Sequence, residues 1–207
     1  MTALKFGKVS LELLGHDSAK ICGSKTVCID PFRIAAGFKA DIIVVTHEHY
    51  DHLSIEDITK ISSEKTKIVC TESCAEKIGK NASGISPGES VEISGVKISA
   101  VEAYNTNKKF HPKGLGIGVV VEMDGIRVYH AGDTDFIPEM SKLGNIDVAF
   151  LPVSGTYVMT AEEAAKAAET IRPKIAVPMH YGSIVGSVAD AEKFKKLYSG
   201  RTEILGK

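Results

Sequence analysis

A hydrophobic segment that ends in a cluster of histidines places the tightest restriction on the fold of this chain. The segment runs from Ile42 to Val45 and consists of β-branched residues without a polar interruption. Such a run is typical of a strand that is covered on both faces, because alternation with polar residues is then lost. Three histidines and an aspartate follow within residues 47–52. The sequence therefore predicts a buried sheet with a polar site at the carboxyl end of one strand.

The histidine cluster has the composition of a metal site. His47, His49, Asp51 and His52 supply imidazole nitrogens and a carboxylate, which suit zinc, iron or manganese better than calcium. In an extended segment His47 and His49 point to the same side, whereas Asp51 and His52 lie on the following turn and can face a second position. A histidine-rich surface loop is the alternative, but three of the seven histidines of the chain fall in this segment. We therefore expect one or two divalent metal ions per chain.

Hydrophobic periodicity and turn residues predict strands and helices along the whole chain. The expected strands are 8–14, 17–22, 26–30, 41–46, 67–70, 90–93, 96–103, 115–123, 126–130, 148–152 and 174–178. The expected helices are 54–61, 71–79, 160–171 and 189–198. Asp124-Gly125 predicts a two-residue hairpin, and residues 160–163 fit a capping box. Two β-rich halves that each end in helices favour an α+β fold, a four-layer αββα sandwich.

Composition restricts the organisation and the partners of the chain. The 207 residues are 43% hydrophobic and 25% charged, which predicts a single domain over residues 1–207. The net charge of -1 and the pI near 6.7 provide no global field for a polyanion, so we do not expect nucleic acid as a partner. No apolar run is long enough for a signal segment or a membrane span, which predicts a cytoplasmic protein. The sequence leaves the oligomeric state open.

The histidine block resembles the HxHxDH motif of the metallo-β-lactamase superfamily, and further motifs follow in the order seen in that family. Gly132-Asp133-Thr134 resembles the segment whose aspartate bridges two metal ions, and residues 178–182 resemble the last histidine motif. The resemblance therefore implies that Asp133 bridges and that His180 joins Asp51 and His52 at one metal. The chain looks most like the branch of small hydrolases that contains ascorbate-6-phosphate lactonase.

The early aspartate of the family is matched by Asp30, which the resemblance places behind the histidine loop as a supporting residue. A strand-end aspartate that caps the turn at Pro31 is an equally good interpretation, and the two are compatible.

One position departs from the family pattern. A strand between the first histidine cluster and the bridging aspartate usually ends in a histidine that completes the first metal with His47 and His49, but here the corresponding strand, 101–104, ends in Asn105. Asparagine is a poor ligand for zinc. His111, in the loop that follows, is our expected substitute, although a role as a loop histidine or a substrate contact stays open.

The resemblance and the ligand types together predict a hydrolase. We expect zinc, with manganese or iron as alternatives, and a metal-held hydroxide that Asp51 orients against a lactone or phosphodiester in a small anionic substrate. Asn105, Lys109 and Tyr181 are the expected substrate contacts. Two other functions remain open: a metal-binding or sensing protein without turnover, and a nuclease acting on RNA or DNA.

Overall fold

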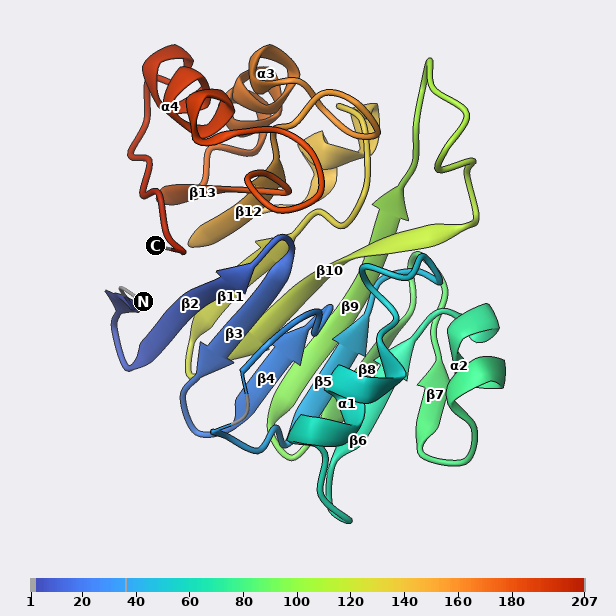
Figure 1. The fold of residues 1–207 in the computed structure, drawn as a ribbon. Coiled ribbons are helices and arrows are strands. Elements are labelled where there is room, and N and C mark those ends of the chain that lie inside the picture. Colours follow the sequence, from blue (N-terminus) through green and yellow to red (C-terminus); the bar gives the residue numbers. More distant parts are fainter. Residues whose placement is uncertain (1–2, 36, 207) are drawn as a thin grey trace.

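The computed structural model describes residues 3–35 and 37–206, and its strands form two mixed sheets (Figure 1). The first sheet has seven strands whose spatial order follows the chain. These are β1 (Leu4–Phe6), β2 (Val9–Gly15), β3 (Ser18–Cys22), β4 (Thr26–Ile29), β5 (Ile42–Val45), β6 (Lys67–Cys70) and β7 (Ala82–Gly84). The second sheet has six strands in reverse order. These are β13 (Ile175–Met179), β12 (Val148–Pro152), β11 (Ile126–His130), β10 (Gly116–Met123), β9 (Val96–Ala103) and β8 (Ser90–Ile93).

The two sheets repeat one topology. In the first, β1 to β4 pair antiparallel, and β5, β6 and β7 are then added in parallel. In the second, β8 to β11 pair antiparallel and β12 and β13 are added in parallel. The parallel steps require crossovers, and helices supply most of them. Each sheet thus has a row of parallel strands whose carboxyl ends lie at one edge.

Helices cover the outer face of each sheet. The first sheet carries α1 (Ile55–Ile61) and α2 (Glu72–Ile78), and the second carries the 3₁₀ helix η1 (Pro138–Lys142), α3 (Ala161–Ile171) and α4 (Val188–Leu197) (Figure 1). Thr160 begins α3 with the predicted capping box, in which its side chain accepts from the backbone of Glu163. Among the described residues, no helix has the length and apolar character that a membrane crossing requires.

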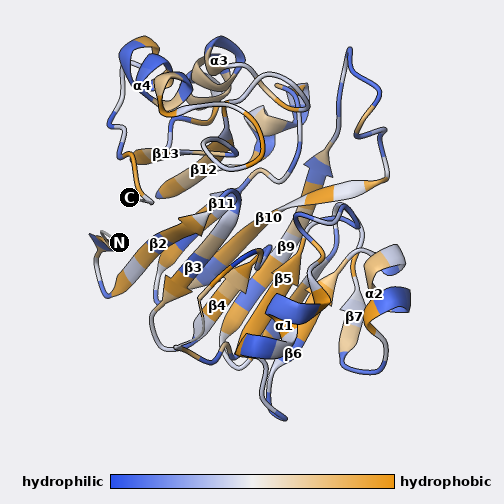
Figure 2. Ribbon diagram, viewed as in Figure 1, coloured by the Kyte–Doolittle hydropathy of each residue, from blue (hydrophilic) through white to orange (hydrophobic). Residues whose placement is uncertain are grey.

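The burial of β5 explains the unbroken hydrophobic run. Ile42 and Val44 belong to the core cluster between the sheets, whereas Ile43 and Val45 pack with Ile58 and Ile61 of α1 beneath the helical layer, in a cluster that includes three buried cysteines. Figure 2 shows hydrophobic residues along the central strands and hydrophilic residues on α1. Because successive side chains of a strand point to opposite faces, β5 must be apolar at every position.

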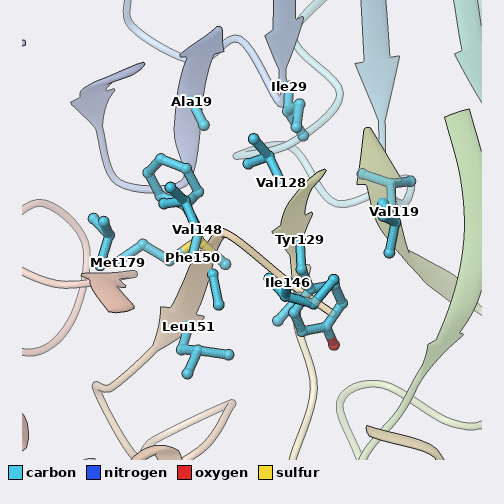
Figure 3. Packing of buried hydrophobic residues seen from close by; sticks show 14 of the residues in the cluster. Ala19, Ile29, Val119, Val128, Tyr129, Ile146, Val148, Phe150, Leu151 and Met179 are labelled. Carbon is cyan, nitrogen blue, oxygen red and sulfur yellow. The ribbon is translucent and has the colours of Figure 1, made fainter. Parts of the chain in front are cut away.

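The core between the sheets is closely packed. Ile29 of β4 lies near Val128 of β11, and Phe150 of β12 packs beside Val148 and Met179 (Figure 3). All of these side chains are buried. This rigid interior fixes the relative position of the strand ends, where the polar cluster lies.

The predicted sandwich is confirmed, and most element boundaries agree within one or two residues. Asp124-Gly125 forms the predicted hairpin, with both residues at positive φ. The prediction missed β1, β7 and η1, which are short segments. Thr71 begins α2 without a side-chain capping hydrogen bond.

Candidate metal centre

Asp30 anchors the histidine loop to the sheet. It lies directly after β4, fully buried, and its Oδ1 accepts a hydrogen bond from the Thr46 backbone N–H at 2.7 Å. Its Oδ2 accepts from Thr46 Oγ1 at 2.6 Å and from His52 Nδ1 at 2.8 Å. The carboxylate therefore fixes both ends of the loop, at Thr46 and at His52, from behind. This is the supporting position that the resemblance implied for Asp30.

The histidine loop then forms a tight turn between His49 and Leu53. The His52 and Leu53 backbone N–H groups both donate to the His49 carbonyl, at 3.0 and 2.8 Å. This turn separates His47 and His49 from Asp51 and His52, so that the two pairs face different positions. The sequence spacing alone suggested this division.

The first half-site consists of His47, His49 and His111. His49 Nδ1 lies 3.0 Å from His47 Nε2 and 3.1 Å from His111 Nε2. Ligands of a tetrahedral zinc ion, each about 2.0–2.1 Å from the metal, lie about 3.3 Å apart, so three nitrogens this close match one ion. The structure therefore brings His111 to the position for which we expected a substitute ligand.

Asn105 holds the loop that returns His111 to the cluster. Its backbone N–H donates to the His111 carbonyl at 2.7 Å, and its side-chain Oδ1 accepts from the His111 backbone N–H at 2.9 Å. The Asn105 amide nitrogen donates to Asp135 and to the Tyr157 carbonyl. Both amide hydrogens are thus used inside the protein. Asn105 positions His111 and does not line the cavity beside the cluster, and its expected role as a substrate contact stays a prediction.

Asp133 lies between the two halves of the cluster. Its Oδ2 is 3.1 Å from His111 Nε2 and 3.3 Å from His180 Nε2, and its Oδ1 is 3.4 Å from His52 Nε2. Gly132 precedes it at φ 61°, where an added Cβ would lie 2.7 Å from the Ile117 carbonyl oxygen. Only glycine fits this backbone conformation without displacing β10.

The second half-site consists of six residues: His16, Asp17, Asp51, His52, Asp133 and His180. Their candidate ligand atoms form two overlapping groups, within each of which all atoms lie within 4.8 Å of one another. Asp51 Oδ2 accepts from His16 Nε2 at 3.2 Å. His16 and His180 adopt positive φ, at 46° and 59°. Non-glycine residues rarely adopt this conformation, and it recurs at functional sites.

His47 and His49 of the first half-site are poised to remain neutral. Burial lowers the pKa of His47 well below its usual value, and the charge of His52 adds to this effect. Burial also lowers the pKa of His49, with a contribution from His111. A neutral imidazole is the form that binds a metal.

The second half-site has the opposite electrostatics. Burial acts to lower the pKa of His52, but the charges of Asp133 and Asp30 outweigh it and raise the pKa well above its usual value. Burial likewise opposes the charges of Asp133 and Asp17 at His180, whose pKa is nevertheless raised to about 9. Without a metal these rings hold protons that a cation would replace.

The donor set fits divalent metal ions. Within the described part of the chain, His52 Nε2, Asp133 Oδ1 and both Asp17 oxygens are buried without a hydrogen-bond partner. Buried polar atoms are otherwise almost always paired, so unpaired nitrogen and oxygen atoms gathered at one point fit the coordination of a cation.

The second ring nitrogens are held by partners from outside the cluster. His47 Nδ1 contacts Thr46 Oγ1 at 3.1 Å, and His111 Nδ1 donates to the Tyr157 carbonyl at 3.3 Å. His180 Nδ1 contacts Ser154 Oγ at 2.8 Å. Such partners fix the orientation of metal-binding rings. Sequence reasoning missed Ser154 and Tyr157, because neither lies in a recognisable motif.

A cavity of about 250 Å³ opens onto the cluster. Its floor comes from His49, Asp51, His111, Asp133 and His180, and its wall from Tyr50, Phe110, Tyr157 and Ile184. The wall is largely aromatic, and the rings of Phe110 and Tyr157 meet edge to face at 4.7 Å. Within the described residues, no lysine or arginine lines this cavity.

The other two predicted substrate contacts also lie outside the cavity. The Tyr181 hydroxyl donates to the Leu205 carbonyl at 3.2 Å, so it is turned away from the metal cluster. Lys109 is exposed and is absent from the cavity lining. Its neighbour Lys108 pairs with Asp135 at 2.6 Å. Proximity in the sequence to a ligand did not place these side chains at the site.

The fold and the donor set define a class of metal-dependent enzyme, and comparison with known proteins agrees. The model of the β-lactamase superfamily domain matches residues 10–180. The chain belongs to the β-lactamase superfamily, and it is a metal-dependent hydrolase. UPF0173 metal-dependent hydrolases from Thermococcus onnurineus and Thermococcus kodakarensis are 38% and 37% identical to it, over 215 and 216 residues, with 95% of each chain covered.

Solved structures support the same assignment. A candidate metal-dependent hydrolase from Parabacteroides distasonis has a TM-score of 0.89 at 36% identity, covering 98% of this chain and 96% of that chain. The metallo hydrolase Igni18 from Ignicoccus hospitalis has a TM-score of 0.79 at 26% identity, covering 96% of this chain and 95% of that chain. The predicted family is therefore confirmed.

Proposed function

We propose that this protein hydrolyses an ester-like bond, a carboxylic ester or lactone, in a small molecule that carries an apolar group beside the bond. The observation that carries the proposal is the cavity of about 250 Å³, which joins an aromatic wall to a floor of metal-binding side chains. Ligand pockets combine apolar walls with a few polar groups in this way. A small acyl group fits this volume, whereas a polymer does not.

We propose two ions per chain, one in each half-site, with zinc in the first. A bound divalent cation supplies Lewis acidity, which lowers the pKa of a water that it holds from about 15.7 to near 7 and polarises the oxygen of the group under attack. Asp133 lies between the half-sites, with its Oδ2 3.1 Å from His111 and 3.3 Å from His180. It holds the two halves at a fixed separation.

Asp51 is our candidate for the residue that orients the attacking water. It lines the cavity, and burial acts to raise its pKa, but the hydrogen bond from His16 and the charge of His52 lower it below its usual value. The carboxylate is therefore ionised at neutral pH and can accept a hydrogen bond from a water molecule in the cavity. His16 fixes its direction through the hydrogen bond at 3.2 Å.

The cavity lining favours an acyl substrate over a phosphodiester or a nucleic acid. Phosphate recognition generally uses arginine or lysine, and none lines the cavity among the described residues. This revises the anionic substrate that the sequence suggested. A nuclease would also need a basic surface, whereas the net charge is -1.

A substrate panel tests the proposal. We expect metal-loaded protein to cleave small aryl esters and lactones, with faster turnover when the acyl group is apolar, and to leave a chromogenic phosphodiester intact. At saturating metal, where the other ligands of the second half-site still hold the ion, Asp51→Asn should lose turnover. Preference for the phosphodiester, or full turnover in that variant, refutes the proposal, and metal-loaded protein inert to every substrate supports a sensing role instead.

Two neighbouring residues provide a matched pair of variants for the cavity wall. Phe110 lines the cavity and is 48% exposed, whereas Lys109 beside it is exposed and does not line it. Phe110→Ala should lower kcat/KM for the apolar substrate on the order of tenfold, the usual scale for lost apolar contact. Lys109→Ala should leave it unchanged. A loss in Lys109→Ala alone would support an anionic substrate.

A further inference from the structure

Asp17 is a carboxylate of the second half-site that no sequence motif of the chain assigns. Its side chain is fully buried, and neither oxygen has a hydrogen-bond partner within the described residues. A buried carboxylate without compensation is strongly disfavoured, so it persists only where a cation or a polar partner is supplied.

The surroundings of Asp17 are those of a ligand. Asp17 Oδ2 lies 3.4 Å from His52 Nε2, 3.7 Å from His16 Nε2 and 3.8 Å from His180 Nε2. None of these contacts meets the geometry of a hydrogen bond. Two ligands that are each about 2.1 Å from one ion lie about 3.0–3.4 Å apart, so these separations need only a small contraction around a shared ion.

The turn that carries Asp17 is held from several directions. His130 Nε2 donates to the Asp17 carbonyl at 2.8 Å, and its Nδ1 accepts from the Gly132 backbone N–H at 3.2 Å. The His180 backbone N–H donates to the His16 carbonyl at 3.0 Å. The backbone of the turn is therefore tied to both ligand-bearing segments of the second sheet, and the carboxylate is fully buried.

We propose that Asp17 is a ligand of the metal ion in the second half-site. The proposal rests on the two-ion site described above and extends it. Asp17, Asp51 and Asp133 then offer three carboxylates beside His52 and His180, more donors than a tetrahedral zinc ion uses. Such an oxygen-rich set suits a five- or six-coordinate ion of the manganese or iron class. The three imidazoles and one carboxylate of the first half-site suit zinc.

The competing role for Asp17 is that of a countercharge for protonated imidazoles, without coordination. In that case an uncharged isostere would leave metal binding intact. A ligand and a countercharge therefore differ in metal stoichiometry and in the distance from the oxygen to the ion.

Asp17→Asn and Asp57→Asn form a matched pair for the test. Asp57 is also a buried carboxylate, at 4% exposure, but its oxygens accept hydrogen bonds from the Arg33 and Ile34 backbone N–H groups, and it belongs to none of the candidate metal-binding groups of the described residues. Metal-free proteins are titrated with Mn²⁺ and with Zn²⁺, and bound metal is counted by elemental analysis after gel filtration. Circular dichroism verifies that each variant is folded.

We expect wild type and Asp57→Asn to bind two equivalents. Asp17→Asn should keep the first and bind the second at least about tenfold more weakly, with the larger loss for Mn²⁺. A crystal structure of metal-loaded wild type should place an Asp17 oxygen about 2.0–2.2 Å from the second ion. Two equivalents bound with unchanged affinity in Asp17→Asn, or an Asp17 oxygen outside coordination distance, overturns the proposal.

The measurements separate this proposal from the proposed function. If Asp17 binds the second ion but wild type cleaves no ester or lactone, only the substrate proposal fails. If wild type cleaves esters and Asp17→Asn keeps both equivalents, only the ligand proposal fails.

Discussion

Raising the pH should destabilise the metal-free protein through His180. Burial acts to lower the pKa of this ring, but the charges of Asp133 and Asp17 prevail and raise it from 6.5 to about 9. The His180 ring thus binds its proton more tightly in the folded state than in the unfolded chain. A group with a raised folded pKa contributes its full stabilisation below the unfolded pKa and loses it as the pH rises through the folded pKa.

The expected loss is large enough to measure. For a pKa of 6.5 in the unfolded chain and about 9 in the folded protein, the free energy of unfolding falls by about 2 kcal/mol between about pH 7 and about pH 8.5. His52, whose pKa is also raised, adds to the loss in the same direction. His47 and His49 have lowered pKa values. Their titration therefore changes the free energy of unfolding only at pH values below about 6.5, which lie outside this interval.

Urea denaturation of chelator-treated protein at several pH values within this interval measures the effect. The upper limit matters because burial raises the pKa of the Cys28 and Cys70 thiols, which adds a further loss above about pH 8.5. His180→Gln should show a much flatter profile, and bound metal should abolish the slope because the ion replaces the proton. A flat wild-type profile, or an unchanged slope in His180→Gln, refutes the electrostatic reasoning.

Three further predictions concern the scaffold of the site. His111→Ala should lose one of the two metal equivalents by elemental analysis, and unchanged stoichiometry would remove it from the first half-site. Asn105→Ala should lower the affinity for the same metal equivalent by about 10–100-fold in a chelator competition, because the loop that carries His111 is no longer fixed, while the other equivalent binds as before. An equal loss of affinity for both equivalents would indicate a general loss of structure. Gly132→Ala should lower the free energy of unfolding by about 1–3 kcal/mol, because its Cβ would lie 2.7 Å from the Ile117 carbonyl oxygen. Gly144→Ala, also at positive φ but with open space around the added Cβ, should cost less in the same urea titration.

The fold could be predicted wherever a local pattern had one structural meaning. The β-branched run in β5, the Asp124-Gly125 hairpin and the capping box at Thr160 each specify a local structure that the sandwich retains. The short strands β1 and β7 have three residues each, too few for periodicity to distinguish them from loops. β1 pairs with β2, which follows it in the chain, and β7 pairs in parallel with β6 across α2, so both are recognised only through these partners.

The sequence predicted which residues could bind a metal, but not which side chains would contact one another or line the cavity. Tyr181 and Lys109 adjoin predicted ligands, yet their side chains lie elsewhere, because sequence proximity does not fix direction in an irregular loop. Asp17 carried a weak signal, an acid beside His16 at a strand turn, which only its burial and its unpaired oxygens make informative. The role of Asn105 depends on a loop closure that the sequence does not encode locally.

The outer partners of the rings explain why the cluster can exist before a metal binds. Four histidines, at positions 47, 52, 111 and 180, contact a partner through Nδ1 and present Nε2 to the cluster. His49 is the exception, since its Nδ1 faces the other two rings. The partners follow directly after β5 and β4 or lie in the segment after β12, so the packed sheets themselves set the ring orientations. A cation then finds its ligands already placed, and the binding free energy is not spent on ordering loops.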